Sequence, residues 1–118
     1  MNALDPQIAR QLAEDLPSDV FINVLRTFED DLSRLAAQMV AAAERGDLEG
    51  YRRGAHGLAG AAGAIGARRL ESLARQAMNP RDATPPAQLL PQLSLAAQET
   101  LRELEALSAA PPPPGPAR

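Results

Sequence analysis

The residue of this chain best suited to chemistry is His56, its only histidine. It lies in a stretch, Arg52 to Ala67, in which glycine recurs at every third position: Gly54, Gly57, Gly60, Gly63 and Gly66. A neutral imidazole is a nucleophile near neutral pH, so it can accept and donate a phosphoryl group. To take that group from the active site of a partner, the ring must stand on a surface with few bulky side chains.

The apolar residues around His56 follow a helical spacing. They recur at gaps of three and four residues: Leu48, Tyr51, Ala55, Leu58, Ala62 and Ile65. This pattern predicts the buried stripe of an amphipathic helix. At about 100° per residue, His56 lies about 130° from the centre of that stripe, so we expect its imidazole to face water.

The same periodicity places arginines and glycines on the face of His56. Arg52 and Arg53 precede it by about one turn and can offset phosphoryl charge or steer an acidic partner. Each glycine in a helix interior costs about 0.5–1 kcal/mol relative to alanine, so outward-facing glycines indicate that something outside approaches the backbone closely. The predicted docking surface beside His56 consists of Gly57, Ala59, Gly60 and Gly63, with Arg52 and Arg53 as electrostatic helpers.

Two other interpretations of the glycines are open. Small residues let helices approach closely, and a single surface histidine then needs no special explanation. A glycine run can also form a dinucleotide-binding loop, but that loop requires a preceding strand and a βαβ pattern, which this sequence lacks. The main alternative to phosphotransfer is therefore a non-catalytic helical adaptor that binds a partner through the glycine-lined face.

Helical signals precede this central segment. Residues 4–15 predict a short helix with Asp5 as its N-cap. A longer helix follows, with Ser18 as its predicted cap. We expect it to end at Gly46, because glycine readily adopts the left-handed conformation that terminates helices. Asp47 is then placed to cap the central helix, which is predicted from about 48 to 64.

Two further helical segments and a tail follow the central helix. Residues 67–78 are apolar on one face and end at a helix-breaking Asn-Pro pair. The last helix starts at Thr84-Pro85-Pro86 and either tolerates an early kink at Pro91 or begins regularly only there. Residues 109–118 form a proline-rich tail that we expect to be disordered.

These segments predict an all-α fold. An up-down-up-down four-helix bundle with a short extra N-terminal helix is the simplest way to bury all the apolar stripes. We assign residues 1–108 to this bundle. A chain of 118 residues is long enough for one domain with one core, so we expect a single domain. With only 3% aromatic residues, the core must be built from leucine and alanine.

Composition excludes several classes of function. A net charge of −3 argues against nucleic-acid binding. The absence of cysteine and the presence of one histidine exclude thiolate chemistry and multi-histidine metal sites. Neither a signal peptide nor an apolar run long enough to span a membrane is recognisable, so we expect a cytoplasmic protein.

The segment AHGLAGAAGAIGARRLESLA, residues 55–74, resembles the signature of histidine phosphotransfer (HPt) domains. The matching positions are Ala55, His56, Leu58, Gly60, Gly66, Leu70, Leu73 and Ala74. The resemblance covers about residues 4–108, although only the central stretch is specific. It implies a four-helix bundle with the phosphorylated histidine exposed on the second core helix.

The resemblance also implies a function and partners. His56 would carry a phosphoryl group between a sensor or hybrid histidine kinase and the aspartates of response-regulator receiver domains. We expect a monomeric carrier without an ATP site or a cofactor of its own, rather than a self-sufficient enzyme, with any Mg²⁺ held by the receiver. The lysine that the family has three residues after the histidine is Ala59 here, which leaves Arg52 or Arg53 to compensate.

Overall fold

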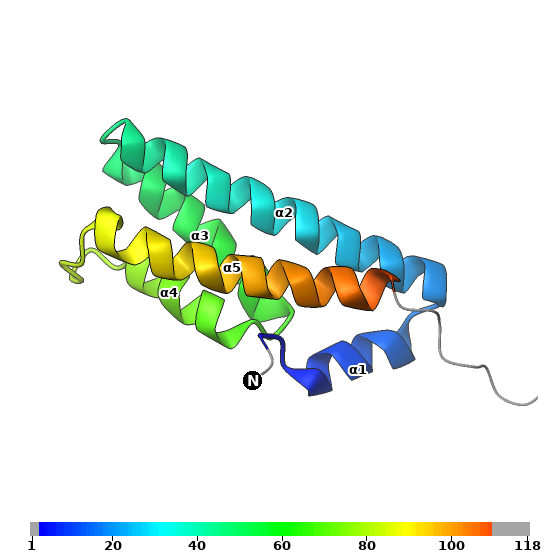
Figure 1. The fold of residues 1–118 in the computed structure, drawn as a ribbon. Helices are drawn as coiled ribbons and strands as arrows, with labels where there is room; N and C mark the ends of the chain where they lie inside the picture. Colours follow the sequence, from blue (N-terminus) through cyan, green and yellow to red (C-terminus); the bar gives the residue numbers. More distant parts are fainter. Residues whose placement is uncertain (1–2, 110–118) are drawn as a thin grey trace, which may run out of the picture.

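The structure is a computed structural model that describes residues 3–109, and these residues form helices joined by short connections (Figure 1). In chain order the helices are α1 (Pro6–Asp15), α2 (Ser18–Glu44), α3 (Leu48–Ala64), α4 (Arg68–Met78) and α5 (Pro86–Ala109). The predicted all-α fold is confirmed. None of the helices in the described residues combines the length and apolar composition that a bilayer span requires.

Helices α2 to α5 form the bundle. α2 packs against α3 and α5, and α4 packs against the same two helices, so helices that follow one another in the chain are also neighbours in space. Tight turns connect α2 to α3 and α3 to α4, which makes these neighbours antiparallel (Figure 1). α1 lies beyond the turn between α3 and α4 and contacts α2. This arrangement is the predicted up-down-up-down bundle with an extra N-terminal helix.

Leucine and alanine build the core, as the low aromatic content predicted. The largest fully buried apolar side chains are Leu25, Leu32, Met39, Leu58, Leu70, Leu89, Leu93 and Leu104. Leu48 was expected in the buried stripe of the central helix but is 47% exposed. It is the first residue of α3, where the chain has just turned out of α2, so the end of the bundle leaves it uncovered.

The signals that start and stop helices act as predicted at three positions. The carboxylate of Asp5 accepts a hydrogen bond from the Gln7 N–H at 2.9 Å. The carboxylate of Asp47 accepts one from the Gly50 N–H at 2.9 Å, which caps the first turn of α3. Gly46 adopts φ +71°, a conformation that glycine reaches without the strain of a side chain, and the chain turns there from α2 into α3.

Two expectations about helix ends are corrected. Ser18 is the first helical residue of α2 rather than its cap, because Pro17 occupies the cap position and no side chain caps this end. α5 runs without interruption from Pro86 through Pro91 to Ala109, so the helix does not begin at the inner proline and includes the first residue of the expected tail. The rest of that tail, 110–118, lies outside the described residues.

Candidate functional site

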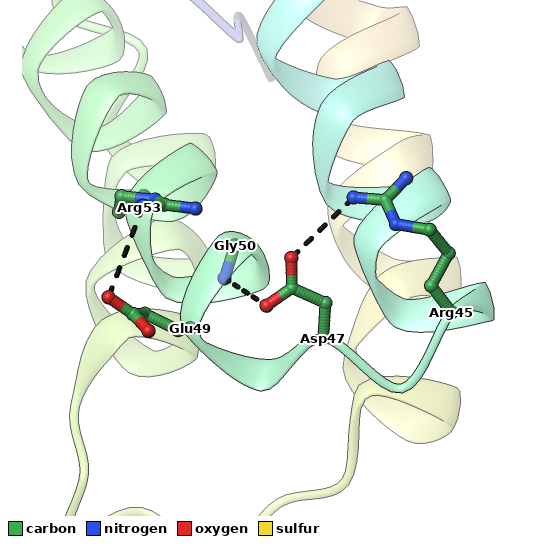
Figure 2. A network of polar contacts seen from close by, with 5 residues as sticks. All are labelled: Arg45, Asp47, Glu49, Gly50 and Arg53. Atoms are coloured by element: carbon green, nitrogen blue, oxygen red, sulfur yellow. Dashed lines mark hydrogen bonds and ion pairs between the residues drawn. The ribbon is translucent and has the colours of Figure 1, made fainter.

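His56 lies in the middle of α3, and its side chain is exposed, as the apolar periodicity predicted. The start of this helix is held by a small polar network (Figure 2). Within it, the Asp47 carboxylate lies 3.6 Å from the Arg45 guanidinium in addition to capping the Gly50 N–H. The hydrogen bond from Gly50, together with Arg45, lowers the pKa of Asp47 from its usual 3.8. The cap is therefore ionised at neutral pH and fixes the first turn of the helix that carries the histidine.

A shallow concavity of about 390 Å³ adjoins His56 on the surface. Arg52, Arg53 and Glu49 line it from α3, and Met78 lines it from the C-terminal end of α4. The two arginines were predicted here from helical spacing. Met78 was not predicted, because the periodicity of one helix does not show which residue of the next helix comes beside it.

The two arginines of the concavity are loosely held. Arg53 lies 4.0 Å from the Glu49 carboxylate, and both side chains are largely exposed, so this pair contributes little to stability (Figure 2). Within residues 3–109, Arg52 has no carboxylate within 4.0 Å. Both guanidinium groups can therefore turn toward an anion placed on His56 without breaking a strong contact.

Gly60 is the neighbour of His56 that the structure leaves most open. A Cβ built on it would have no heavy atom within 4 Å, apart from its own chain neighbours and helix backbone. Internal packing therefore does not require glycine at this position. The predicted outward placement is confirmed, and the histidine has a bare patch of backbone one turn further along α3.

The other small residues of the predicted docking surface lie against neighbouring helices. Ala59 is only 3% exposed, so the expectation that it faces a partner is wrong. A Cβ on Gly57 would lie 2.9 Å from Leu35 of α2, and one on Gly63 would lie 3.0 Å from the Glu71 carboxylate of α4. Because α2 and α4 flank α3, the exposed positions around the histidine lie on one line of the helix, through Arg53, His56 and Gly60.

An all-α bundle displays one histidine from the middle of a helix, beside arginines and an unpacked glycine, so a nucleophilic side chain stands where another protein can reach it. The family model of the Hpt domain matches residues 23–110, about three-quarters of the chain. The chain belongs to the Hpt domain family, whose role is histidine phosphotransfer in two-component systems. α1 precedes the matched range. Comparisons with curated proteins and with solved structures give no match.

Proposed function

We propose that this protein carries a phosphoryl group on His56 between a sensor or hybrid histidine kinase and the aspartate of a response-regulator receiver domain, as a monomer in the cytoplasm. The observation that carries the proposal is the exposure of His56 beside the open Gly60, within the range that matches the family. Its imidazole can enter the active site of another protein because the backbone at Gly60, one turn further along the helix, is left open.

The transfer exchanges one bond to phosphorus for another. A ring nitrogen of neutral His56 attacks the phosphorus of the receiver's aspartyl phosphate. The N–P bond forms as the P–O bond to the aspartate breaks, and the bonding electrons leave with the carboxylate. The second ring nitrogen keeps its proton, so the same exchange can run backward toward another aspartate.

The residues of this chain assist that exchange through charge and position. Arg52 and Arg53, in the concavity beside His56, lie where they can balance the negative charge of the phosphoryl group. This chain supplies the acceptor nitrogen and the docking face, and we expect the acidic site of the receiver to supply any Mg²⁺. The protein is then a carrier that depends on the activity of its partners.

The test is to label the protein with phosphorylated receiver domains, and separately with phosphoramidate, and to map the acid-labile phosphate. Phosphoramidate transfers its phosphoryl group to the imidazole with loss of ammonia. We expect one labelled residue, His56, and no label in His56→Gln, whose circular dichroism should equal that of the wild type because the side chain is exposed. Acid-labile transfer retained in His56→Gln would refute the assignment. Receiver binding without any transfer would instead favour the adaptor alternative.

A further inference from the structure

The charges of this chain are divided between two layers of the bundle. α3 and α4 together carry five arginines and two acidic residues, a net charge of +3. α2 and α5 together carry three arginines and eight acidic residues, a net charge of −5. Because α3 packs on α4 and α2 packs on α5, His56 belongs to a cationic layer of a protein whose overall charge is negative.

The register between α3 and α4 shows which arginine of α4 lies level with the part of α3 that starts at His56. Gly63 of α3 lies beside Glu71 of α4, and His56 shares its concavity with Met78. Both helices rise 1.5 Å per residue and run in opposite directions, so positions between these two pairs follow in reverse order. Arg75 therefore lies level with the segment of α3 between His56 and Gly63.

Arg75 is held in a defined orientation at this level. Its Nε and Nη2 groups donate hydrogen bonds to the Glu71 carboxylate at 3.0 Å and 2.7 Å. The Glu71 side chain is only 19% exposed because it lies over Gly63, whereas the Arg75 side chain is 62% exposed. Glu71 thus orients the guanidinium on the side of α4 next to α3 and leaves its other donors at the surface.

The opposite flank of His56 is formed by α2. There the contact at Gly57 is with the apolar end of Leu35, and the nearby Arg34 is paired with Asp31 at 3.3 Å. The concavity beside His56 is instead lined by Met78 of α4, so an acidic protein that enters it lies over the cationic layer.

We propose that the acidic receiver domain docks across α3 and α4, on the α4 side of His56, with Arg75 as a second point of contact. This proposal rests on the proposed function, and it adds the surface of the bundle through which the receiver reaches His56. The Glu71–Arg75 pair pre-orients one donor group for a carboxylate of the receiver, which lowers the entropy cost of forming that contact.

The test uses the receiver domain that accepts phosphate fastest from the phosphorylated wild-type protein. Its dissociation constant is measured by titration calorimetry at low and high salt for the wild type, Arg75→Glu, Arg34→Glu on α2 and Arg102→Glu on α5. The three variants change the net charge equally and replace exposed arginines. We expect Arg75→Glu to weaken binding about tenfold and to reduce its salt dependence, and the other two to change binding less than about twofold.

Two results would overturn the docking face. One is unchanged receiver affinity in Arg75→Glu, and the other is an equal or larger loss in Arg34→Glu, which would place the partner over α2. Unchanged circular dichroism and continued labelling of His56 by phosphoramidate in Arg75→Glu separate a docking defect from a damaged site. Failure of every receiver to take phosphate from the wild type would overturn the proposed function, and the docking face with it, before any variant is compared.

Discussion

A methyl group on Gly54 would lie 2.8 Å from Cγ of Met39, a side chain of α2 that is fully buried. A methyl group on Gly60 of the same helix would meet no heavy atom within 4 Å. The two glycines therefore have different physical roles. The first lets α2 and α3 approach closely, and the second leaves a gap on the exposed face beside His56.

Alanine substitutions separate these roles through stability. We expect Gly60→Ala to raise the free energy of unfolding by about 0.5–1 kcal/mol, because alanine favours the helix and nothing crowds the new methyl. Gly54→Ala should lower it by about 1–3 kcal/mol, since overpacking against Met39 outweighs the gain in helix propensity. Urea unfolding followed by circular dichroism measures both. Equal destabilisation by the two substitutions would contradict the assignment of Gly60 to an open face.

A bulky residue at the open position should block docking without unfolding the protein. In Gly60→Leu we expect phosphotransfer with the receiver to slow by at least about tenfold, because the new side chain holds the active site of the receiver away from His56. The free energy of unfolding should stay at or above that of the wild type. Gln98→Leu, at an exposed position of α5, is the matched control and should transfer at the normal rate. Normal transfer in Gly60→Leu would exclude this patch from the docking surface.

The segment before α1 is hydrogen-bonded to the turn that follows α3 and to α5. The Asp5 N–H donates to the Gly66 carbonyl at 2.9 Å, the Leu4 N–H donates to Glu103 at 3.1 Å, and the Leu4 side chain is 5% exposed. We expect Leu4→Ala to destabilise the fold by about 2–3 kcal/mol through loss of buried apolar surface. Leu12→Ala, at a half-buried position of α1, should cost less. Thermal unfolding provides the comparison, and a negligible effect of Leu4→Ala would show that the N-terminal segment is not part of the core.

Tyr51 is a buried polar side chain whose hydroxyl lacks a hydrogen-bond partner within the described residues. The side chain is 2% exposed, and burial raises the pKa of its phenol. Removing an unpaired buried hydroxyl relieves its desolvation penalty, so Tyr51→Phe should raise the free energy of unfolding by about 1 kcal/mol. A loss of stability in urea unfolding would instead reveal a partner for the hydroxyl, such as an internal water molecule.

Stability should fall in acid partly because of the cap of α3. The hydrogen bond from Gly50 and the nearby Arg45 lower the pKa of Asp47 below its usual 3.8. A carboxyl group with a lowered folded-state pKa stabilises the fold above its unfolded pKa, and this contribution is lost as the pH falls through the folded value. Asp47→Asn keeps an acceptor for the cap but does not titrate. Its melting temperature should therefore drop less than that of the wild type between pH 7 and about pH 3.

A charge-matched variant provides the control for this measurement. Asp30→Asn removes one carboxylate from an exposed position in the middle of α2. We expect its loss of melting temperature in acid to follow that of the wild type more closely than Asp47→Asn does. Identical acid sensitivity in Asp47→Asn and the wild type would show that the ionised cap has no measurable role.

The helix that carries the site could be predicted from residues that lie close together in the chain. The apolar spacing around His56 predicted both the helix and the outward direction of the imidazole, and the structure agrees. Asp47 and Gly46 marked the start of α3 and the preceding stop. These predictions succeeded because caps, left-handed glycines and helical periodicity depend only on a few neighbouring residues of one segment.

The surroundings of that helix, in contrast, depend on how the helices pack together. It buried Ala59, placed the Glu71 carboxylate over Gly63, and brought Met78 beside His56. Periodicity states where a side chain points relative to the axis of its own helix. The direction from which α2 and α4 approach that axis, and their register along it, follow from the packing of all the apolar stripes together, and this packing leaves Gly60 as the open neighbour of the histidine.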